Sequence, residues 1–194
     1  MNRKRSWGEE NKSTLDTIIE YLRFNKINKY IPQNCVLLDL GCGYNGTLLK
    51  KYRNSIKKGV GIDLSVNDKD TDIKLIEGRI DKKIKLRSNE FDIITSLAVI
   101  EHVESPKTML KEAYRLLKKD GILLITTPSK YNKPILEFLA FRINVISKDE
   151  IKDHKRYYDK FSLEKELALA GFSKNKIKVE YFQLGLNIFA IAKK

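Results

Sequence analysis

The sequence predicts a single α/β domain in which helices cover both faces of a largely parallel β-sheet. Short apolar runs typical of buried parallel strands alternate along the chain with amphipathic stretches typical of helices. The 194 residues suffice for one domain, and the balance of 42% hydrophobic and 32% charged residues is that of a globular protein. No repeat, low-complexity tract or linker rich in Pro and Ser divides the chain, so we expect one compact unit.

An amphipathic helix is expected near the N-terminus. Apolar residues recur at helical spacing from Thr14 to Ile31, with Ser13 placed as a cap and Pro32 as a stop. We therefore assign residues 1–33 to an N-terminal helical arm and residues 34–194 to the main domain.

Five apolar runs follow as candidate parallel strands, and helices fit between several of them. The connection Ser65–Asp72 is too short for a full helical crossover, so we expect a loop or a single helical turn there. The helix that begins at Pro106 is expected to end before Asp120 and Gly121. The expected strands are Cys35–Leu40, Gly59–Asp63, Ile73–Glu77, Phe91–Ser96 and Gly121–Thr127, and the expected helices are about Thr47–Lys57, about Pro106–Lys118 and Ser162–Ala170.

The C-terminal part of the chain predicts a β-hairpin. Two strand-like pieces, Lys176–Phe182 and Asn187–Ala192, are separated by Gly185. They are expected to pair in antiparallel fashion and to finish the sheet. The whole pattern then predicts a mostly parallel seven-stranded sheet whose last strand is reversed.

Cysteine usage and hydropathy restrict the setting in which the protein works. Cys35 and Cys42 are too few for a disulfide scaffold and do not have the spacing of a zinc site, so reduced thiols are expected. No apolar stretch approaches the roughly 20 residues of a membrane span, and the basic N-terminus lacks the apolar core of a signal peptide. We expect a cytoplasmic protein without a transmembrane segment.

The chain is strongly basic, with 38 Lys and Arg against 25 Asp and Glu and a formal net charge of +13. Such a balance is compatible with a nucleic-acid partner, because basic residues that neutralise phosphates supply most non-specific affinity. The basic residues occur in short clusters scattered along the chain, which favours a solvated surface. A nucleic-acid partner is therefore left open and is not favoured.

The most informative stretch is a glycine-rich bend after the first expected strand. Gly41, Gly43 and Gly46 follow this strand in the pattern Gly-x-Gly-x-x-Gly, which allows a tight turn and close approach of the backbone to a ligand. Twenty residues beyond Gly43, the next strand ends in Asp63, whose carboxylate can accept hydrogen bonds from both hydroxyls of a ribose. Together the two features predict a nucleotide-type cofactor at this edge of the sheet.

Asp39 helps to choose between two kinds of cofactor. In a dinucleotide site the pyrophosphate lies over the glycine turn, and a carboxylate two residues before the first glycine would repel it. S-adenosylmethionine instead carries an ammonium and a sulfonium at its amino-acid end, which an acid tolerates or prefers. The position of Asp39 therefore favours S-adenosylmethionine over a nicotinamide or flavin dinucleotide.

From about Cys35 to the C-terminus, the chain resembles the class I S-adenosylmethionine-dependent methyltransferases of the type 11 and type 23 group. This resemblance implies a three-layer Rossmann-like fold, S-adenosylmethionine as cofactor and S-adenosylhomocysteine as product. The motifs that carry it are Leu37–Gly43, Val60–Ser65, Glu90–Val103, Leu116–Pro128 and Ala170–Phe172.

The resemblance also implies a set of cofactor-binding residues and no metal site. Arg79 stands where the family usually has an acid, and the third glycine, Gly46, comes one residue late, so this sequence departs from the family at two points. The implied contacts are Asp39, Gly41, Cys42 and Gly43 at the methionine end, Asp63 at the ribose, Leu64, Arg79 and Ile80 around the adenine, and Ser96 and Leu97 near the transferred methyl group.

Methyl transfer from a sulfonium is an in-line displacement, so the main task of the enzyme is to align the reacting atoms. A general base is needed only if the nucleophile has a proton to lose. The two histidines, His102 after the fourth strand and His154 in the stretch before the last helix, are the candidates for that role, and Tyr157 or Tyr158 could line the acceptor pocket.

An insert at about 129–151 is predicted to be a substrate lid. Its centre, Pro134–Ile146, is unusually apolar. A hydrophobic acceptor, a dimer face, attachment to a membrane surface and a helix packed on the sheet all remain open explanations for this composition.

The sequence thus predicts a methyltransferase that acts on a small molecule through an oxygen, nitrogen or carbon nucleophile. A glycan precursor or a hydrophobic metabolite would suit the acceptor site, and the protein is expected to be a monomer or a homodimer. The alternative is an RNA or protein methyltransferase on the same fold. The residues Ser96–Ala98 occupy the place of the Asn/Asp-Pro-Pro motif of many base-amino methyltransferases, and neither cysteine follows a proline, as the nucleophile of cytosine methyltransferases does.

Overall fold

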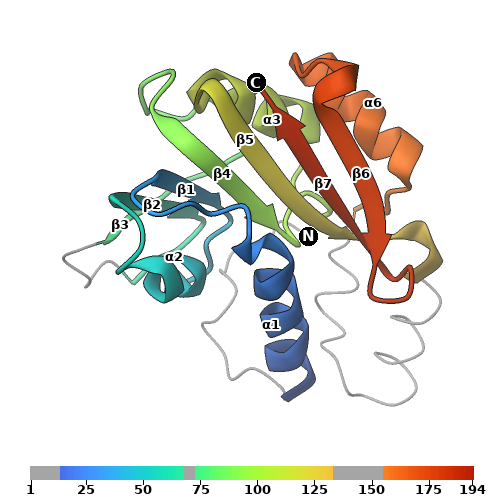
Figure 1. Cartoon of the computed structure of the whole chain (residues 1–194), viewed down its shortest axis with the longest axis horizontal. Coiled ribbons are helices and arrows are strands. Elements are labelled where there is room, and N and C mark those ends of the chain that lie inside the picture. Colours follow the sequence, from blue (N-terminus) through green and yellow to red (C-terminus); the bar gives the residue numbers. More distant parts are fainter. Residues whose placement is uncertain (1–13, 68–72, 133–154) are drawn as a thin grey trace.

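Seven strands form one mixed sheet in the computed structural model, which describes residues 14–67, 73–132 and 155–194. The strand order is β3-β2-β1-β4-β5-β7-β6, and β7 runs antiparallel to both of its neighbours (Figure 1). This arrangement confirms the predicted sheet with a reversed last strand. The strands are β1 (Val36–Leu40), β2 (Lys58–Asp63), β3 (Ile73–Glu77), β4 (Phe91–Leu97), β5 (Leu117–Pro128), β6 (Ile177–Phe182) and β7 (Asn187–Lys193).

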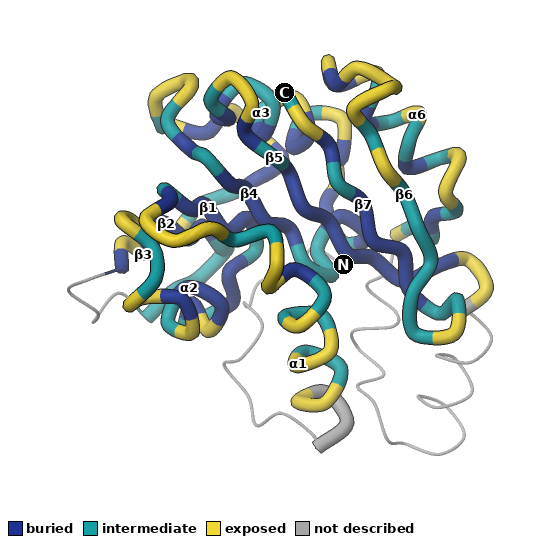
Figure 2. The backbone as a smooth tube through the Cα atoms, viewed as in Figure 1, coloured by how far each residue is buried: buried dark blue, intermediate teal, exposed yellow. Residues whose placement is uncertain are grey.

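Helices pack on both faces of the sheet and complete three layers. Helices α1 (Thr14–Asn28) and α2 (Thr47–Tyr52) share one buried cluster with Leu37, whereas α3 (Pro106–Leu116) and α6 (Lys160–Ala170) share the other with Leu38. Neighbouring residues of a strand point to opposite faces, so the apolar run of β1 supplies both cores. Figure 2 shows the resulting pattern, with the central strands buried between more exposed helices.

Several helix and strand boundaries differ from those predicted from the sequence. Helix α2 ends at Tyr52 instead of Lys57, because the backbone N–H of Lys57 donates to Cys35 O at 2.8 Å beside the start of β1. Helix α1 ends at Asn28 instead of Ile31. Strand β5 begins at Leu117, directly after α3, and its regular pairing with β4 resumes at Ile122.

The connection from β2 to β3 contains no helix in its described part, Leu64–Asn67, as the short spacing predicted. The backbone N–H of Asn67 donates to Tyr44 O at 2.7 Å, which ties this connection to the glycine bend. The predicted cap Ser13 and the insert from residue 133 onward lie outside the described residues.

Candidate active site

The carboxyl ends of β1, β2 and β4 meet at one edge of the sheet, where a glycine bend follows β1. Gly41 and Gly43 have φ angles of 79° and 71°, which L-residues with a side chain rarely adopt. A Cβ atom on Gly41 would lie 2.3 Å from Cγ2 of Val99, so this position has no room for a side chain. The side chain of Val99 therefore fills the space beside Gly41, and the bend requires glycine at this position.

Asp63 ends β2 and holds the glycine bend in place. Its Oδ2 accepts a hydrogen bond from the N–H of Gly43 at 2.8 Å, and its Oδ1 accepts one from the N–H of Leu64 at 2.7 Å. Each carboxylate oxygen can accept more than one hydrogen bond, so both oxygens keep capacity for ribose hydroxyls. The structure thus brings two of the predicted cofactor positions into direct contact.

Asp39 is a buried acid near the same bend, with an exposed fraction of only 4%. Its Oδ1 accepts a hydrogen bond from Thr95 Oγ1 at 2.7 Å. Burial first, and then the nearby carboxylates of Asp63 and Glu20, raise the pKa of Asp39 to about 7 against the lowering effect of the Thr95 hydrogen bond. None of these groups is a cation, so the site favours a positively charged ligand.

Sequence reasoning missed the contribution of Glu20. This residue belongs to α1, yet its charge acts on Asp39 at the end of β1. The N-terminal helix therefore carries an acidic group whose charge reaches the end of β1. No sequence motif marks this residue, because its role depends on how α1 crosses the sheet.

Cys42 contributes little beyond its backbone. Its thiol lies in the core between α2 and the sheet, where a Cβ atom on Gly61 would come within 2.7 Å of Sγ. Burial, followed by the charges of Asp39 and Asp63, raises the pKa of the thiol well above its usual range. Reduced, buried thiols at Cys35 and Cys42 agree with the expectation from composition.

At the predicted adenine end, Ile80 is buried and Arg79 is held by acids. The Arg79 guanidinium donates to both oxygens of Asp81, at 3.0 and 2.9 Å, and to Glu104 Oε2 at 2.8 Å. Its direct role toward the adenine stays a prediction. Asp81, which the sequence did not single out, also accepts the N–H of Glu104 at 3.0 Å and so fixes the loop after β4.

The carboxyl end of β4 presents two of the predicted residues. Ser96 is fully buried, and its Oγ has no hydrogen-bond partner within the described segments, whereas Leu97 is half-buried. His102 follows in the loop after β4, where it is half-buried and its backbone N–H donates to Val99 O at 2.9 Å. Its position beside this edge is compatible with the predicted role in proton transfer.

Glu101, beside His102, is a buried carboxylate that the sequence did not reveal as unusual. Its exposed fraction is 1%, and its Oε2 accepts a hydrogen bond from Thr127 Oγ1 at 3.0 Å. This contact joins the loop after β4 to the end of β5. Glu101 therefore fixes the loop that carries His102.

The second catalytic candidate, His154, lies outside the described residues. Tyr158 of the same stretch is buried in the core beside α6, where its hydroxyl donates to Glu166 Oε2 at 3.4 Å. Burial and the Glu166 carboxylate hold the pKa of Tyr158 well above its usual range. The ring of Tyr158 is therefore part of the core between the sheet and α6.

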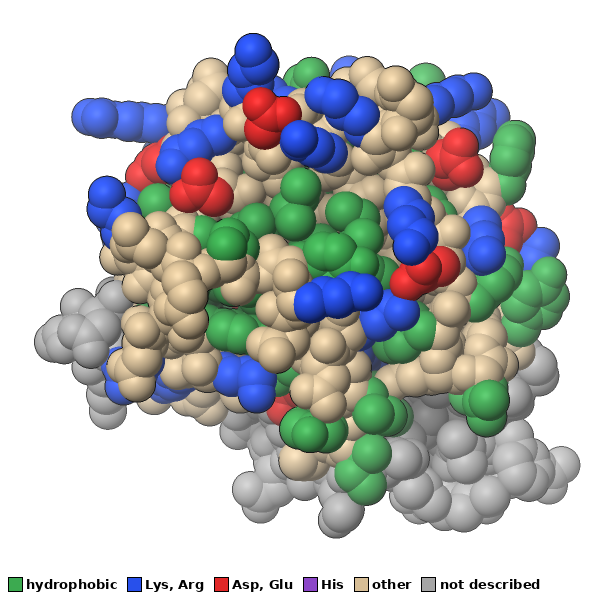
Figure 3. All heavy atoms as spheres, in the orientation of Figure 1, with side chains coloured by type: hydrophobic (Ala, Val, Ile, Leu, Met, Phe, Trp, Pro, Cys, Tyr) green, Lys and Arg blue, Asp and Glu red, His purple; other side chains and the backbone are tan. Residues whose placement is uncertain are grey.

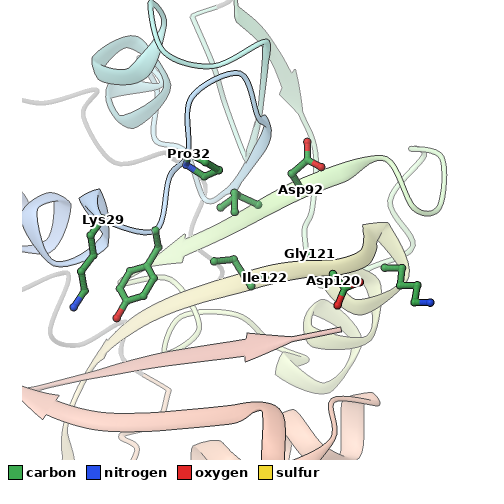
Figure 4. A pocket seen from close by; sticks show the side chains of 9 residues that line it. Lys29, Pro32, Asp92, Asp120, Gly121 and Ile122 are labelled. Carbon is green, nitrogen blue, oxygen red and sulfur yellow. The ribbon is translucent and has the colours of Figure 1, made fainter.

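A surface hollow of about 410 Å³ lies at the opposite edge of the sheet, near the start of β4 (Figure 4). It is distinct from the crevice at the carboxyl ends of the strands and contains none of the predicted site residues. Its lining consists of Lys29, Tyr30, Pro32, Asp92, Ile93, Lys119, Asp120, Gly121 and Ile122.

Segments 14–67, 73–132 and 155–194, the part of the chain that the structure describes, contain no helix that is long and apolar enough to cross a membrane. They also contain no cluster of three or more His, Cys, Asp or Glu side chains arranged to hold a metal ion.

A parallel sheet with a glycine bend after β1 and an acid at the end of β2 defines a nucleotide-cofactor enzyme of the α/β class. A sequence model of the methyltransferase domain family matches residues 8–176. The chain belongs to this family, whose cofactor is S-adenosylmethionine, and the resemblance inferred from the motifs is confirmed.

Known proteins are similar to this chain at two levels. A ubiquinone biosynthesis O-methyltransferase of Pelagibacter ubique is 31% identical over 123 residues, which cover 59% of this chain and 50% of the relative. A corresponding enzyme of Actinobacillus pleuropneumoniae serotype 7 is 28% identical over 105 residues, covering 47% of this chain and 44% of the relative. The chain thus spans about half the length of these curated relatives.

Among solved structures, a methyltransferase of Thermotoga maritima, described as a possible histamine N-methyltransferase, has a TM-score of 0.68. It is 20% identical, and the match covers 93% of this chain and 91% of that one. This level of identity shows a shared fold.

The residues of the crevice fit S-adenosylmethionine. Asp63 ends β2 beside the glycine bend, and each of its carboxylate oxygens can accept a further hydrogen bond from a ribose hydroxyl. The buried acid Asp39 and its acidic neighbours match the ammonium and sulfonium of this cofactor.

Proposed function

We propose that this protein transfers a methyl group from S-adenosylmethionine to a hydroxyl oxygen of a small molecule. The observation that carries the proposal is the acidic crevice at the glycine bend, where Asp39 is buried without a cation among the groups that act on it. The choice of oxygen is supported by the O-methyltransferase names of the curated relatives.

In this proposal the residues of the crevice bind and orient the cofactor. Asp63 accepts the ribose hydroxyls and keeps the bend closed through the N–H of Gly43. Asp39 orients the cationic methionine end, and the bound cofactor supplies an activated methyl group on a sulfonium with a thioether as leaving group. Alignment of the acceptor oxygen with that methyl group then supplies most of the rate enhancement.

The remaining predicted positions lie close to the transfer. Ser96 and Leu97 border the place where the methyl group moves, at the carboxyl end of β4. His102 accepts the proton that the hydroxyl nucleophile loses, and Glu101 holds the loop that positions His102. Helix α1, which belongs to the proposed N-terminal arm, carries Glu20, whose charge adds to the acidity around Asp39.

Replacement of Asp63 tests the cofactor site. We expect Asp63→Ala to weaken S-adenosylmethionine binding by about tenfold or more, because both the ribose acceptor and the anchor of the Gly43 turn are lost. Isothermal titration calorimetry measures the change, and thermal unfolding separates it from loss of the fold.

Asp92→Asn is the matched control. Asp92 is also an acid on a central strand, but it lies at the start of β4, where its Oδ2 accepts the N–H of Val36 at 2.8 Å. The control variant is expected to keep the wild-type affinity. Equal affinity of wild type and Asp63→Ala would refute the ribose assignment.

A further inference from the structure

Two side-chain amides, the buried Asn187 and the half-buried Gln183, lie at the end of the sheet with hydrogen-bonding groups left over. Asn187 opens β7, and its Nδ2 donates to Oε1 of Gln183, which follows β6. Asn187 has an exposed fraction of 6%, and both its Oδ1 and Gln183 Nε2 are buried without a partner in the described part of the chain. Buried polar atoms are nearly always hydrogen-bonded, so this pair is unusual.

The turn that carries the pair has an uncommon backbone. Gln183 and Leu184 have φ angles of 52° and 57°, and Gly185 follows at 86°. Left-handed residues other than glycine are uncommon and tend to occur where a side chain is held for function. Here the turn directs the Gln183 amide back onto Asn187.

Strand register places the pair beside the methyl-transfer edge. Asn187 pairs with Pro128 at the carboxyl end of β5, and two residues earlier Thr126 pairs with Leu97 of β4. Leu97 and Phe189, the partners of Thr126 on either side, belong to the cluster under α1 and α2. Because strand residues two apart share a face, Leu97, Thr126 and Asn187 form a row on that face.

Two further observations describe the surroundings of this row. Thr126 is fully buried, and its Oγ1 has no partner among the described residues. Helix α1 covers the end of the row, since Lys26 Nζ lies 5.4 Å from the centroid of the Phe189 ring. Figure 1 shows the β6–β7 turn at the same end of the sheet as the end of β4.

We propose that the Asn187–Gln183 amide pair, together with Thr126, binds a hydroxyl group of the acceptor substrate. This inference rests on the proposed function and names residues that select the acceptor. The pair leaves one unused acceptor, Asn187 Oδ1, and one unused donor, Gln183 Nε2. If both amides are rotated by 180°, the acceptor and the donor change places, and one of each is still left. One hydroxyl both donates and accepts, whereas a carboxylate offers no donor and an ammonium offers no acceptor.

Nuclear magnetic resonance of the ¹⁵N-labelled protein, saturated with S-adenosylhomocysteine, tests the proposal with phenol as probe. The side-chain amide signals of the pair are assigned by their loss in Asn187→Leu and Gln183→Met. We expect phenol to shift both signals saturably and to bind about tenfold more tightly than toluene, which has the same ring without the hydroxyl. Both variants should lose that advantage and keep their affinity for S-adenosylhomocysteine.

Gln33→Met is the matched control, because Gln33 is exposed and lies before β1, away from the row. It is expected to bind phenol as the wild type does. The proposal is overturned if phenol leaves both signals unmoved, if toluene binds as tightly as phenol, or if neither variant weakens phenol binding. If Asn187→Leu does not fold, the binding of phenol and toluene to Gln183→Met alone tests the proposal. Failure of S-adenosylhomocysteine to bind the wild-type protein would instead refute the proposed function.

Discussion

At the scale of single residues, the surroundings of Asp39 disfavour the charged form of its carboxyl group. Burial and the neighbouring acids raise its pKa from 3.8 to about 7, so the folded protein holds this proton more tightly than the unfolded chain does. Between those two values, the stability of the folded protein without cofactor falls as the pH rises. The position therefore costs stability at neutral pH, which a bound cation would offset.

Asp39→Asn is expected to raise the stability of the cofactor-free protein. Asparagine keeps an oxygen for the Thr95 hydroxyl and removes the buried charge. The gain should be roughly 2–4 kcal/mol at about pH 8, should shrink as the pH falls and should vanish below the ordinary pKa of an aspartate. Urea denaturation at a series of pH values measures it, and a gain that is constant with pH would contradict the assigned pKa.

The same variant is expected to bind S-adenosylmethionine more weakly, by about tenfold at pH 8, because it loses the attraction between carboxylate and cation. In the wild type, affinity should increase as the pH rises through about 7, where Asp39 becomes charged. In Asp39→Asn this dependence should disappear. Calorimetry at matched pH values separates the two effects, and an unchanged pH profile would remove Asp39 from the methionine site.

The central residues of the crevice could be predicted from the sequence because local geometry determines them. A glycine bend after one strand and an acid at the end of the next require only that the two strands are neighbours. Glu20, Thr95 and Asp81 could not be predicted, because their contacts join segments that are distant along the chain. Their roles follow from packing, which the motif does not contain.

At the scale of elements, the start of α6 shows how a few contacts set a helix boundary. Asp159 Oδ1 accepts the N–H of Ser162 at 2.8 Å, and Ser162 Oγ accepts the N–H of Asp159 at 3.0 Å. Asp159 Oδ2 also pairs with Lys130 Nζ at 2.8 Å. The sequence predicted that this helix begins at Ser162, whereas the structure begins it at Lys160 with Asp159 as the cap.

Asp159→Ala is expected to lower the free energy of unfolding by about 1 kcal/mol, the usual effect of losing an N-cap. The ion pair with Lys130 and the bonds from Ser162 hold the pKa of Asp159 below its ordinary value of 3.8. Such a group stabilises the fold above that value, and its contribution is lost as the pH falls below it. The difference between wild type and variant should therefore become smaller in acid, where only the cap formed by the uncharged carboxyl group remains.

Asp159→Asn is the control for this prediction. Asparagine caps helices about as well as aspartate, so this variant should lose only the weak, half-exposed pair with Lys130. Thermal unfolding of the three proteins at neutral and acidic pH makes the comparison. A loss in Asp159→Asn equal to that in Asp159→Ala would assign the effect to the ion pair instead of the cap.

The seven-stranded sheet and its reversed last strand were predictable, while several helix ends were not. Strands β1, β2 and β4 are short apolar runs that are buried on both faces, whereas β3 at the edge of the sheet alternates buried and exposed residues. The end of α2 depends on a tertiary contact, the hydrogen bond from Lys57 to Cys35, which is absent from local sequence patterns. Boundaries of this kind become visible only when neighbouring elements are in place.

At the scale of the whole molecule, the net charge of +13 and the charge of the crevice have opposite signs. Figure 3 shows Lys and Arg side chains spread over one face, with acids and apolar residues between them. Several Lys side chains of the protein form ion pairs with acids, as in Lys58–Glu90, Lys118–Asp92 and Lys193–Asp120. The crevice itself carries Asp39 and Asp63, and the charge of Glu20 also acts on Asp39.

This distribution predicts that RNA binds the protein only through its surface. A short oligouridine should bind at about 50 mM salt and weaken roughly tenfold or more by about 200 mM, because released counterions supply the affinity. Saturation with S-adenosylhomocysteine should leave that binding unchanged, since a phosphate chain is repelled from the acidic crevice. Fluorescence anisotropy with and without the cofactor product measures both effects. RNA binding that resists salt and is strengthened by S-adenosylhomocysteine would instead place a nucleic acid at the acceptor site, and the proposal of a small-molecule substrate would then be wrong.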